Sequence, residues 1–306
     1  MTKKYDVLIL GGGPAGVTAG IYLSKFGVSC AIIEKDRIGG QLNQTTEILN
    51  YPGFDFVTGE ELSAKMKKQL EACQVPVIFD EVVDTSLCGE IKKVVTNNET
   101  LEAKSVIIAS GTSVRTLNIE NEKQFLGKGV YYSATAEKNK VLNENVAVIG
   151  GGNSALEDAL LLAEKANKVF LVHRRTTFRA DQSLVERVNK KQNIQILTPY
   201  VPKYFVAFQH IEGLNVENTE SKEQKTIDVS KVFILVGRDA SNDFVDPSIV
   251  RTQQGYIAGD DKMQTNVEGV FVAGDARNTY LRQIVCATSD GAMSALACLN
   301  FLRKQK

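Results

Sequence analysis

Two stretches of the chain share one pattern of apolar and polar positions. Residues 5–34 read YDVLILGGGPAGVTAGIYLSKFGVSCAIIE, and residues 145–173 read NVAVIGGGNSALEDALLLAEKANKVFLVH. In each stretch a short apolar run leads into a glycine-rich turn, an amphipathic helical pattern follows, and a second apolar run ends the stretch. This order predicts a strand, a turn, a helix and a second strand, and it occurs twice.

The turn between strand and helix carries the chemistry of these repeats. At a constant offset the positions correspond: Gly11, Gly13 and Gly16 in the first stretch, and Gly150, Gly152 and Ala155 in the second. In a dinucleotide-binding turn, the first glycine permits the bend, the second lets the backbone approach a pyrophosphate, and the third allows close helix packing. The N-terminus of the helix, where Pro14 suits the first position, then binds phosphate. One match to this glycine pattern could also come from a strand–helix–strand unit that binds no ligand. Two matches in one chain favour two nucleotide sites.

The residues that end the second apolar run differ between the repeats. The first ends at Glu34, whose carboxylate can accept hydrogen bonds from ribose hydroxyls and repels a 2′-phosphate. The second ends at His173 and continues with Arg174, Arg175 and, a turn later, Arg179. Guanidinium groups can hold a phosphate through paired hydrogen bonds. We therefore predict a dinucleotide with free ribose hydroxyls at the first site and NADP at the second, with a solvated basic strand end as the alternative.

The second repeat lies inside the chain, so the first domain is expected to resume after it. Polar, turn-forming residues predict crossings near Ser113–Leu117 and Asp239–Asp243. The predicted fold is α/β with two Rossmann-like dinucleotide-binding domains, the second inserted in the first. Residues 1–115 and 244–306 would form the first domain and residues 116–243 the second. Apolar segments within 184–235 predict strands that complete the inserted domain.

Further apolar runs point back to the first domain. Val106–Ser110 lead into Gly111, and Val270–Ala273 lead into Gly274 and Asp275. A helical pattern follows, and Thr288, Ser289 and Asp290 are expected to cap its start. The N-terminus of this helix, if it faced a flavin, would stabilise the negative charge of the reduced ring. A capped surface helix is the alternative.

Composition narrows the class of protein. The chain has 306 residues, 43% hydrophobic and 24% charged, with 36 Lys and Arg against 36 Asp and Glu. This balance gives no electrostatic case for a nucleic-acid or membrane-surface partner, and no apolar run approaches the ~18 residues that span a bilayer. The two histidines exclude a zinc cluster built on several of them. Five scattered cysteines without an export signal predict reduced thiols in a cytoplasmic protein.

Several segments together resemble the low-molecular-weight thioredoxin reductases over nearly the whole chain. They are GGGPAG with Glu34, GGQLNQTTEILNYPGF at 39–54, VIIASGT at 106–112, VIGGGNSALEDA at 148–159, VHRRTTFRA at 172–180, VFVAGDA at 270–276 and RQIVCATSDGAMSALA at 282–297. The resemblance implies a homodimer and domains of the three-layer ββα type. It implies FAD in the discontinuous first domain and NADPH in the inserted one.

The resemblance also implies cofactor contacts position by position. For FAD these are Gly11, Gly13, Pro14, Ala15, Glu34, Gly40, Gln41, Leu42, Asn50, Ala109, Gly111, Gly274, Asp275, Arg282, Gln283 and Ile284. For NADPH they are Gly152, Asn153, Ser154, Arg174, Arg175 and Arg179. Asn153 replaces an acid common in the family, a change that should not impair phosphate binding.

One stretch departs from the family. Where the family has Cys-Ala-Thr-Cys followed by Asp-Gly, this chain has Ser133 and Ala136 at the cysteine positions, followed by Glu137 and Lys138. Serine and alanine form neither a disulfide nor a thiolate–flavin adduct. A laboratory substitution would change only the two cysteines, so the changed residues after them favour natural divergence. Cys286 follows Arg282–Ile284 closely and could lie near the flavin, although a small apolar packing role is the favoured interpretation.

The leading hypothesis is an enzyme in which NADPH reduces FAD and the flavin passes electrons to a non-disulfide acceptor. That acceptor could be dioxygen, a quinone, a ferredoxin-type carrier or a small molecule. The first alternative keeps disulfide or thioredoxin reduction, through Cys286 or through the cysteines of a partner. The second is a flavin-bound regulatory or assembly subunit without turnover.

Overall fold

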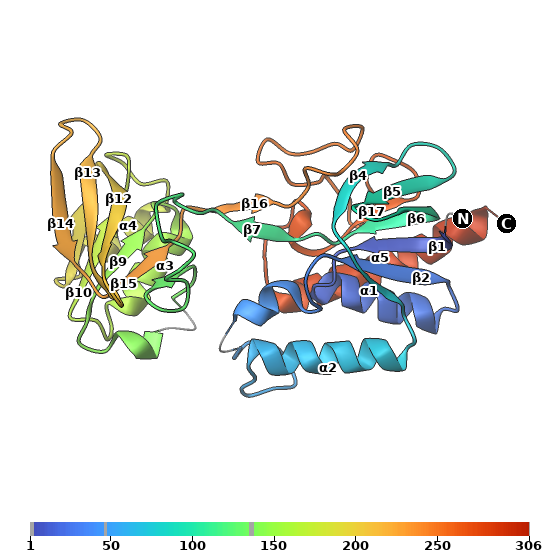
Figure 1. Cartoon of the computed structure of the whole chain (residues 1–306), viewed down its shortest axis with the longest axis horizontal. Helices are drawn as coiled ribbons and strands as arrows, with labels where there is room; N and C mark the ends of the chain where they lie inside the picture. The colour runs from blue at the N-terminus through green and yellow to red at the C-terminus, as the bar shows by residue number, and fades with distance from the viewer. Residues whose placement is uncertain (1–2, 46–47, 135–137, 306) are drawn as a thin grey trace. The chain divides into compact units, whose positions relative to one another are not determined.

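The chain divides into two compact units, one of which is inserted in the other. A computed structural model describes residues 3–45, 48–134 and 138–305. The first unit comprises Met1–Ser113 and Asp239–Lys306, and the second comprises Val114–Arg238 (Figure 1). The crossings thus lie at 113/114 and 238/239, where the sequence predicts 115/116 and 243/244. Strands β7 (Thr112–Val114) and β16 (Arg238–Ala240) carry the two crossings and pair in a two-stranded sheet.

The first unit contains both ends of the chain. Besides β7 and β16, its elements are β1 (Lys3–Leu10), α1 (Pro14–Lys25), β2 (Cys30–Glu34), the 3-10 helix η1 (Gly40–Gln44), α2 (Gly59–Ala72), β3 (Val77–Phe79), β4 (Val82–Ser86), β5 (Lys92–Thr96), β6 (Thr100–Ile108), β17 (Val270–Val272), the 3-10 helix η3 (Gly274–Ala276) and α5 (Ile284–Lys304).

A seven-stranded sheet forms the centre of this unit, in the order β3-β2-β1-β6-β5-β4, with β17 also paired to β6. Alternation along β1 divides the core. Val7 and Ile9 pack with residues of α1, α2 and α5 on one face, whereas Leu8 and Leu10 pack with residues of β5 and β6 on the other. Strands β1, β2, β3, β6 and β17 are parallel, so their carboxyl ends share one edge. The predicted α/β class is confirmed.

The helices of the first unit begin where local signals place them, with one exception. Pro14 occupies the first position of α1, and Thr58 and Glu61 form a capping box at the start of α2. The predicted start of the last helix at Thr288–Asp290 is wrong, because α5 begins at Ile284 and Gln283 precedes it without a side-chain cap. Asp290 lies inside the helix, where its carboxylate is used by tertiary contacts instead.

By length and composition, α5 could also cross a membrane, which differs from the expectation that no segment has this property. Length and composition alone are weak evidence for a membrane span, because the core helix of a globular domain meets the same criteria. Ala295, Cys298 and Leu302 bury one side of α5 in a core that includes Ala19 and Leu23 of α1. These contacts are those of a core helix.

The inserted unit has its own sheets. Its elements are β8 (Val130–Tyr131), the 3-10 helix η2 (Lys138–Val141), β9 (Asn145–Ile149), α3 (Asn153–Leu162), β10 (Lys168–Val172), α4 (Gln182–Asn189), β11 (Ile194–Leu197), β12 (Tyr200–Ala207), β13 (Ile211–Asn218), β14 (Gln224–Asp228) and β15 (Lys231–Ile234).

A parallel five-stranded sheet, in the order β11-β10-β9-β15-β8, forms the centre of the inserted unit. Strands β12, β13 and β14 form a separate antiparallel sheet. Phe233 of β15 is fully buried and its ring stacks on that of Tyr131, with ring centroids 5.4 Å apart. The apolar segments of 184–235 thus do form strands, and the unit repeats the strand–turn–helix–strand order of the first.

We predict that Gly16→Ala lowers the melting temperature of the protein. A Cβ on Gly16 would lie 1.9 Å from the carbonyl oxygen of Gly11, so helix α1 must move away from the turn. Overpacking of this kind costs about 1–3 kcal/mol, which corresponds to roughly 2–12 °C for domains of this size. Calorimetry of the apoprotein measures the shift. Gly13→Ala is the matched control, because its Cβ would meet nothing within 4 Å; equal shifts for both variants would contradict the prediction.

Candidate functional site

The turn after β1 lies against the backbone that follows β6. Gly11 has φ +111°, and a Cβ on it would lie 2.4 Å from the carbonyl oxygen of Ala109, just beyond the end of β6. A Cβ on Gly13 would meet no atom within 4 Å, and no side chain caps the helix there. The turn is therefore closed toward the sheet and open at Gly13. The first N–H groups of α1 have no partner within the helix, so this opening suits a phosphate.

Glu34 lies beside this turn, at the end of β2. One carboxylate oxygen, Oε2, accepts a hydrogen bond of 2.6 Å from the Gly12 N–H. The other, Oε1, accepts one of 2.9 Å from the Asp36 N–H. A carboxylate offers about four lone-pair sites, so capacity remains for ribose hydroxyls. The fixed position of Glu34 beside the glycine turn is the arrangement that a nucleotide ribose requires.

Other FAD-contact candidates come from distant parts of the chain and meet in pairs. The Gln41 side chain in η1 donates to the carbonyl oxygen of Thr112 at 2.8 Å. Thr112 follows Gly111, which has φ +68°. The Asn50 side-chain amide donates to Oε1 of Gln283 at 3.0 Å. Residues near positions 41, 50, 111 and 283 are thereby linked within the first unit.

Gly274 lies against the start of α1, beside the glycine turn. A Cβ on Gly274 would lie 2.9 Å from that of Ala15 in α1, so the 3-10 helix that contains Asp275 packs on the start of α1. The Gly274 N–H donates to Asp290 at 3.1 Å, and Nε of Arg277 donates to the same carboxylate at 3.2 Å. Asp290 therefore fixes η3 rather than capping a helix.

Arg282 holds a buried donor without an acceptor. Its Nε has no hydrogen-bond partner within the described residues, while its guanidinium lies 4.0 Å from the centre of the Tyr256 ring. Buried donors are normally paired, so this atom is the one expected to contact a bound group. Leu42, by contrast, is 3% exposed and packs in the core, so its side chain is not available, and Ile284 is half-buried. The open turn at Gly13, the Glu34 carboxylate and the Arg282 donor together fit FAD.

The turn after β9 repeats the same geometry in the inserted unit. Gly150 has φ +156°, and a Cβ on it would lie 2.4 Å from the carbonyl oxygen of Leu235, just beyond the end of β15. A Cβ on Gly152 would meet no atom within 4 Å. A Cβ on Gly151 would lie 2.3 Å from the His173 ring. This turn is also closed toward the sheet and open where a phosphate would bind.

His173 supports the loop that follows β10. The side chain is buried, its Nε2 lies 3.1 Å from the carbonyl oxygen of Thr177, and its ring stacks on that of Phe178 at 5.4 Å between centroids. Burial lowers the pKa of His173, and the positive charges of Arg179 and its neighbours lower it further. The ring is therefore uncharged at neutral pH and acts as a packed support for the loop.

The arginine side chains of this loop are exposed. Arg174, Arg175 and Arg179 follow β10, and none of them pairs with a carboxylate in the described part of the chain. The Arg179 N–H donates to the carbonyl oxygen of Gly151 at 2.8 Å, which ties the loop to the glycine turn. Three cations beside an open phosphate turn suit a nucleotide with an additional phosphate.

Asn153 uses its side chain within the protein. Its amide nitrogen donates to Asp181 at 2.8 Å, and its amide oxygen accepts from the Asp181 N–H at 2.9 Å. Asn153 thereby links the start of α3 to the residue before α4, and its backbone remains for a phosphate. Ser154 is exposed on the first turn of α3.

Ser133 is exposed and follows β8. The next residue, Ala134, is buried, and its N–H donates to Oδ2 of Asp158 at 2.9 Å. Burial raises the pKa of Asp158 to about 6. Ala136, the other residue at a cysteine position, lies outside the described residues.

All five cysteines are free thiols. Cys30 and Cys298 are buried, and burial raises the pKa of each thiol to about 12. Cys88 is exposed and Cys73 is half-buried. Cys286 is half-buried in the first turn of α5, two residues after Ile284. No group of His, Cys, Asp and Glu within the described ranges could hold a metal ion.

Some residues of the site were missed by sequence reasoning. Phe178, Thr177 and Asp181 hold the arginine loop, and Gly151 makes room for His173. Their roles depend on packing across the loop, for which the glycine motif gives no signal. The GGG run itself could have indicated that the middle glycine is also sterically required.

Known proteins are similar to this chain over its whole length. The family model for pyridine nucleotide-disulphide oxidoreductases matches residues 5–291. The thioredoxin reductase of Ureaplasma parvum serovar 3 is 36% identical over 306 residues, covering 99% of this chain and 98% of the relative. The solved thioredoxin reductase from Streptococcus pyogenes MGAS5005 is 35% identical, with a TM-score of 0.83 over 99% of this chain and 100% of that one.

A more distant solved structure is also similar. A ferredoxin-flavin thioredoxin reductase from Clostridium acetobutylicum is 26% identical, with a TM-score of 0.54 over 100% of this chain and 99% of that chain. Thioredoxin reductases use FAD and NADPH, which agrees with the cofactors predicted for the two glycine turns. The chain belongs to the thioredoxin reductase family of flavin-dependent pyridine nucleotide-disulphide oxidoreductases.

Proposed function

We propose that this protein takes electrons from NADPH through FAD and delivers them to a non-disulfide acceptor. The observation that supports this acceptor class is Ser133, an exposed hydroxyl where the family's pattern has the first redox cysteine. We infer that Ala136 stands at the second cysteine position. No two cysteines in the chain are separated by two residues, so the relay of a conventional dithiol reductase is missing.

On the flavin side, the chain supplies binding and orientation. The turn at Gly13 and the start of α1 would hold the pyrophosphate, and Glu34 would hold the ribose. Arg282 would direct its unpaired Nε toward the bound group. When bound, FAD supplies the chemistry that accepts a hydride and releases electrons.

On the NADPH side, the inserted unit would bind the pyrophosphate at Gly152 and the 2′-phosphate at the arginine loop. Arg174, Arg175 and Arg179 supply the cations, while His173 and Gly151 fix the backbone beneath them. Because His173 is uncharged at neutral pH, discrimination between NADPH and NADH would come from the arginines.

The proposed acceptor class includes a ferredoxin-type carrier. Dioxygen, quinones and small molecules are the other members of the class. A second candidate function is disulfide reduction through another thiol, because the relatives are thioredoxin reductases and Cys286 is half-buried in the first turn of α5. Flavin bleaching on anaerobic mixing with NADPH separates both from a regulatory subunit without turnover.

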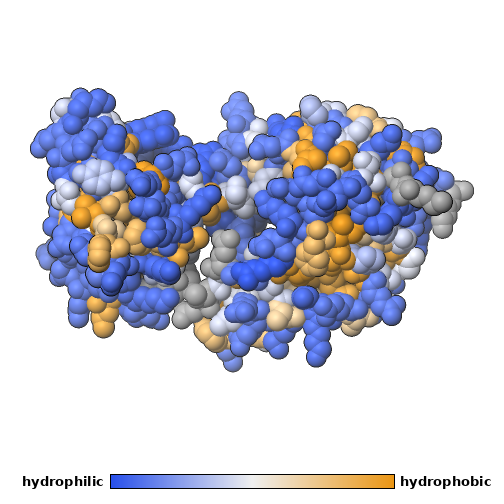
Figure 2. Space-filling model, in the orientation of Figure 1, coloured by the Kyte–Doolittle hydropathy of each residue, from blue (hydrophilic) through white to orange (hydrophobic). Residues whose placement is uncertain are grey.

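The proposed functional state is a cytoplasmic homodimer. On the face shown in Figure 2, hydrophilic residues predominate and hydrophobic ones gather in smaller areas. Val285, Met293 and Leu296 of α5 are more than 40% exposed, and Tyr22 of α1 is 44% exposed. Exposed apolar side chains on two packed helices suit burial against a second copy of the chain. The free thiols suit a reducing compartment.

Glu34→Arg is expected to weaken FAD binding by at least tenfold. The substitution removes the ribose acceptor and places a cation beside the glycine turn, and each lost charge-assisted hydrogen bond is worth about 1.5–3 kcal/mol. The FAD-to-protein ratio after dialysis measures the effect from the flavin absorbance. Glu81→Arg, an exposed position whose carboxylate lies 3.8 Å from Nζ of Lys35, is the control. A colourless wild-type protein that cannot be reconstituted with FAD would overturn the proposed function.

Arg174→Ala and Arg175→Ala should each weaken NADPH binding by about 10–100-fold and leave NADH binding nearly unchanged. Loss of one charge-assisted contact to the 2′-phosphate has this size. Titration calorimetry with both nucleotides provides the measurement, with Arg187→Ala on α4 as the control. Equal losses for the two nucleotides would show that the arginines do not contact the 2′-phosphate.

Wild-type protein should show negligible NADPH-dependent thioredoxin reduction but measurable reduction of dyes, quinones or dioxygen. The reaction needs one thiolate to attack the disulfide and a second thiol to resolve it, and neither Ser133 nor Ala136 supplies one. Coupled assays compare wild type, Ser133→Cys with Ala136→Cys, and Cys286→Ser. The double variant should recover weak disulfide reduction at most, because Glu137 and Lys138 also change the flank.

The Cys286→Ser variant separates the two candidate functions. Thioredoxin turnover by the wild type that disappears in Cys286→Ser would favour the second candidate over the first. Turnover that persists in this variant would contradict the proposed acceptor class.

A further inference from the structure

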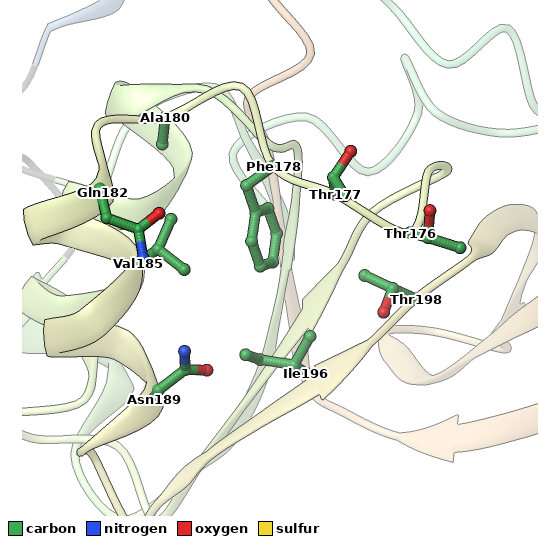
Figure 3. A pocket seen from close by; sticks show the side chains of 9 residues that line it. All are labelled: Thr176, Thr177, Phe178, Ala180, Gln182, Val185, Asn189, Ile196 and Thr198. Atoms are coloured by element: carbon green, nitrogen blue, oxygen red, sulfur yellow. The ribbon is translucent and has the colours of Figure 1, made fainter.

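A hollow of about 380 Å³ lies in the inserted unit, between the arginine loop, α4 and β11. Figure 3 shows the Phe178 ring directed into the space between α4, which carries Gln182 and Asn189, and Ile196 of β11. Thr198 borders it beyond the end of β11. Its volume is at the lower end of the range of small-molecule sites, about 300–1,000 Å³, which suits a nucleoside better than a dinucleotide.

The hollow is separate from the proposed NADPH contacts. The glycines of the turn and the three arginine side chains do not line it. It is bordered instead by other residues of the same loop, namely Thr176, Thr177 and Phe178 between Arg175 and Arg179, and Ala180 after Arg179. One loop thus presents the arginines to the nucleotide and other residues to the hollow.

The lining has a distinct chemistry. No charged residue lines the hollow, so it offers no counter-ion to a charged ligand. One face of the Phe178 ring is covered by His173, and another part of the ring borders the hollow. The side-chain amides of Gln182 and Asn189 make no hydrogen bond within the part of the chain that the structure describes. An aromatic surface flanked by two free amides suits a flat, uncharged ring with hydrogen-bonding edges.

We propose that this hollow binds an uncharged nitrogen heterocycle no larger than a nucleoside, such as adenosine or nicotinamide, and that occupancy changes the affinity of the arginine loop for the NADP 2′-phosphate. The first part stands on the hollow alone, and the second rests on the proposed function.

The coupling follows from how the loop is held. The Arg179 N–H donates to the Gly151 carbonyl oxygen at 2.8 Å, and His173 Nε2 donates to the backbone carbonyl oxygen of Thr177 at 3.1 Å. The Phe178 ring between these attachments contacts both His173 and the hollow. A ligand that packs on Phe178 therefore acts on the segment that positions the arginines, and the effect on the two affinities is reciprocal.

The test measures adenosine and nicotinamide binding to the FAD-loaded protein by saturation-transfer NMR, with and without saturating NADP⁺. Ile196→Trp fills the hollow. Gln195→Trp is the matched control, because the adjacent residue on β11 faces the opposite side of the sheet. Asn189→Leu removes one amide without adding bulk, in case the tryptophan disturbs folding. Titration of NADP⁺ with and without adenosine measures the coupling.

At least one probe should bind the wild type and Gln195→Trp, bind Ile196→Trp at least tenfold more weakly, and bind Asn189→Leu more weakly. Saturating probe should change the NADP⁺ dissociation constant at least threefold. The proposal is overturned if neither probe binds at 10 mM, or if Ile196→Trp and Asn189→Leu both bind as the wild type does. A further outcome is that the wild type binds a probe that Ile196→Trp does not bind, and yet fails to bind NADP⁺. That result would support the hollow as a binding site and contradict NADPH as the electron donor.

Discussion

Each of the two nucleotide turns rests on the same close approach between a glycine and a neighbouring strand. The Cβ positions of Gly11 and Gly150 would each lie 2.4 Å from a carbonyl oxygen, that of Ala109 in one unit and that of Leu235 in the other. Any side chain there would push the turn away from the sheet. With the turn pressed against the sheet, the start of the following helix points its free N–H groups into the opening at Gly13 or Gly152, and the other site residues take their positions from that opening.

The two units then use the middle glycine of the turn in different ways. The Glu34 carboxylate accepts the Gly12 N–H, whereas the His173 ring lies directly over Gly151. Both residues directly end or follow the second strand of their unit. The first places a negative charge beside the turn, and the second places an uncharged ring there and leaves the surface to exposed arginines. One backbone design thereby gives two sites of opposite charge.

Much of this arrangement can be predicted from sequence, because it depends on local order. The apolar runs, the glycine spacing and the residues that end each second strand give the two units and the character of each site. The start of α5 could not be predicted in this way. Asp290 has the side chain of a good cap, but its use is decided by Gly274 and Arg277. The glycine motif likewise does not predict the hollow beside Phe178, because the hollow depends on how α4 and β11 pack across the loop.

The insertion has a consequence for how the protein is made. All of the inserted unit leaves the ribosome before residues 239–306 do, and its strands and helices are contiguous in sequence. The first unit, in contrast, pairs β17 with β6 and packs α5 on α1, so its core stays incomplete until the last helix emerges. During synthesis, the face of β1 and β6 that packs on helices stays partly uncovered until α5, more than 150 residues downstream, has been made. The nucleotide unit that comes second in sequence is therefore the one that can fold first.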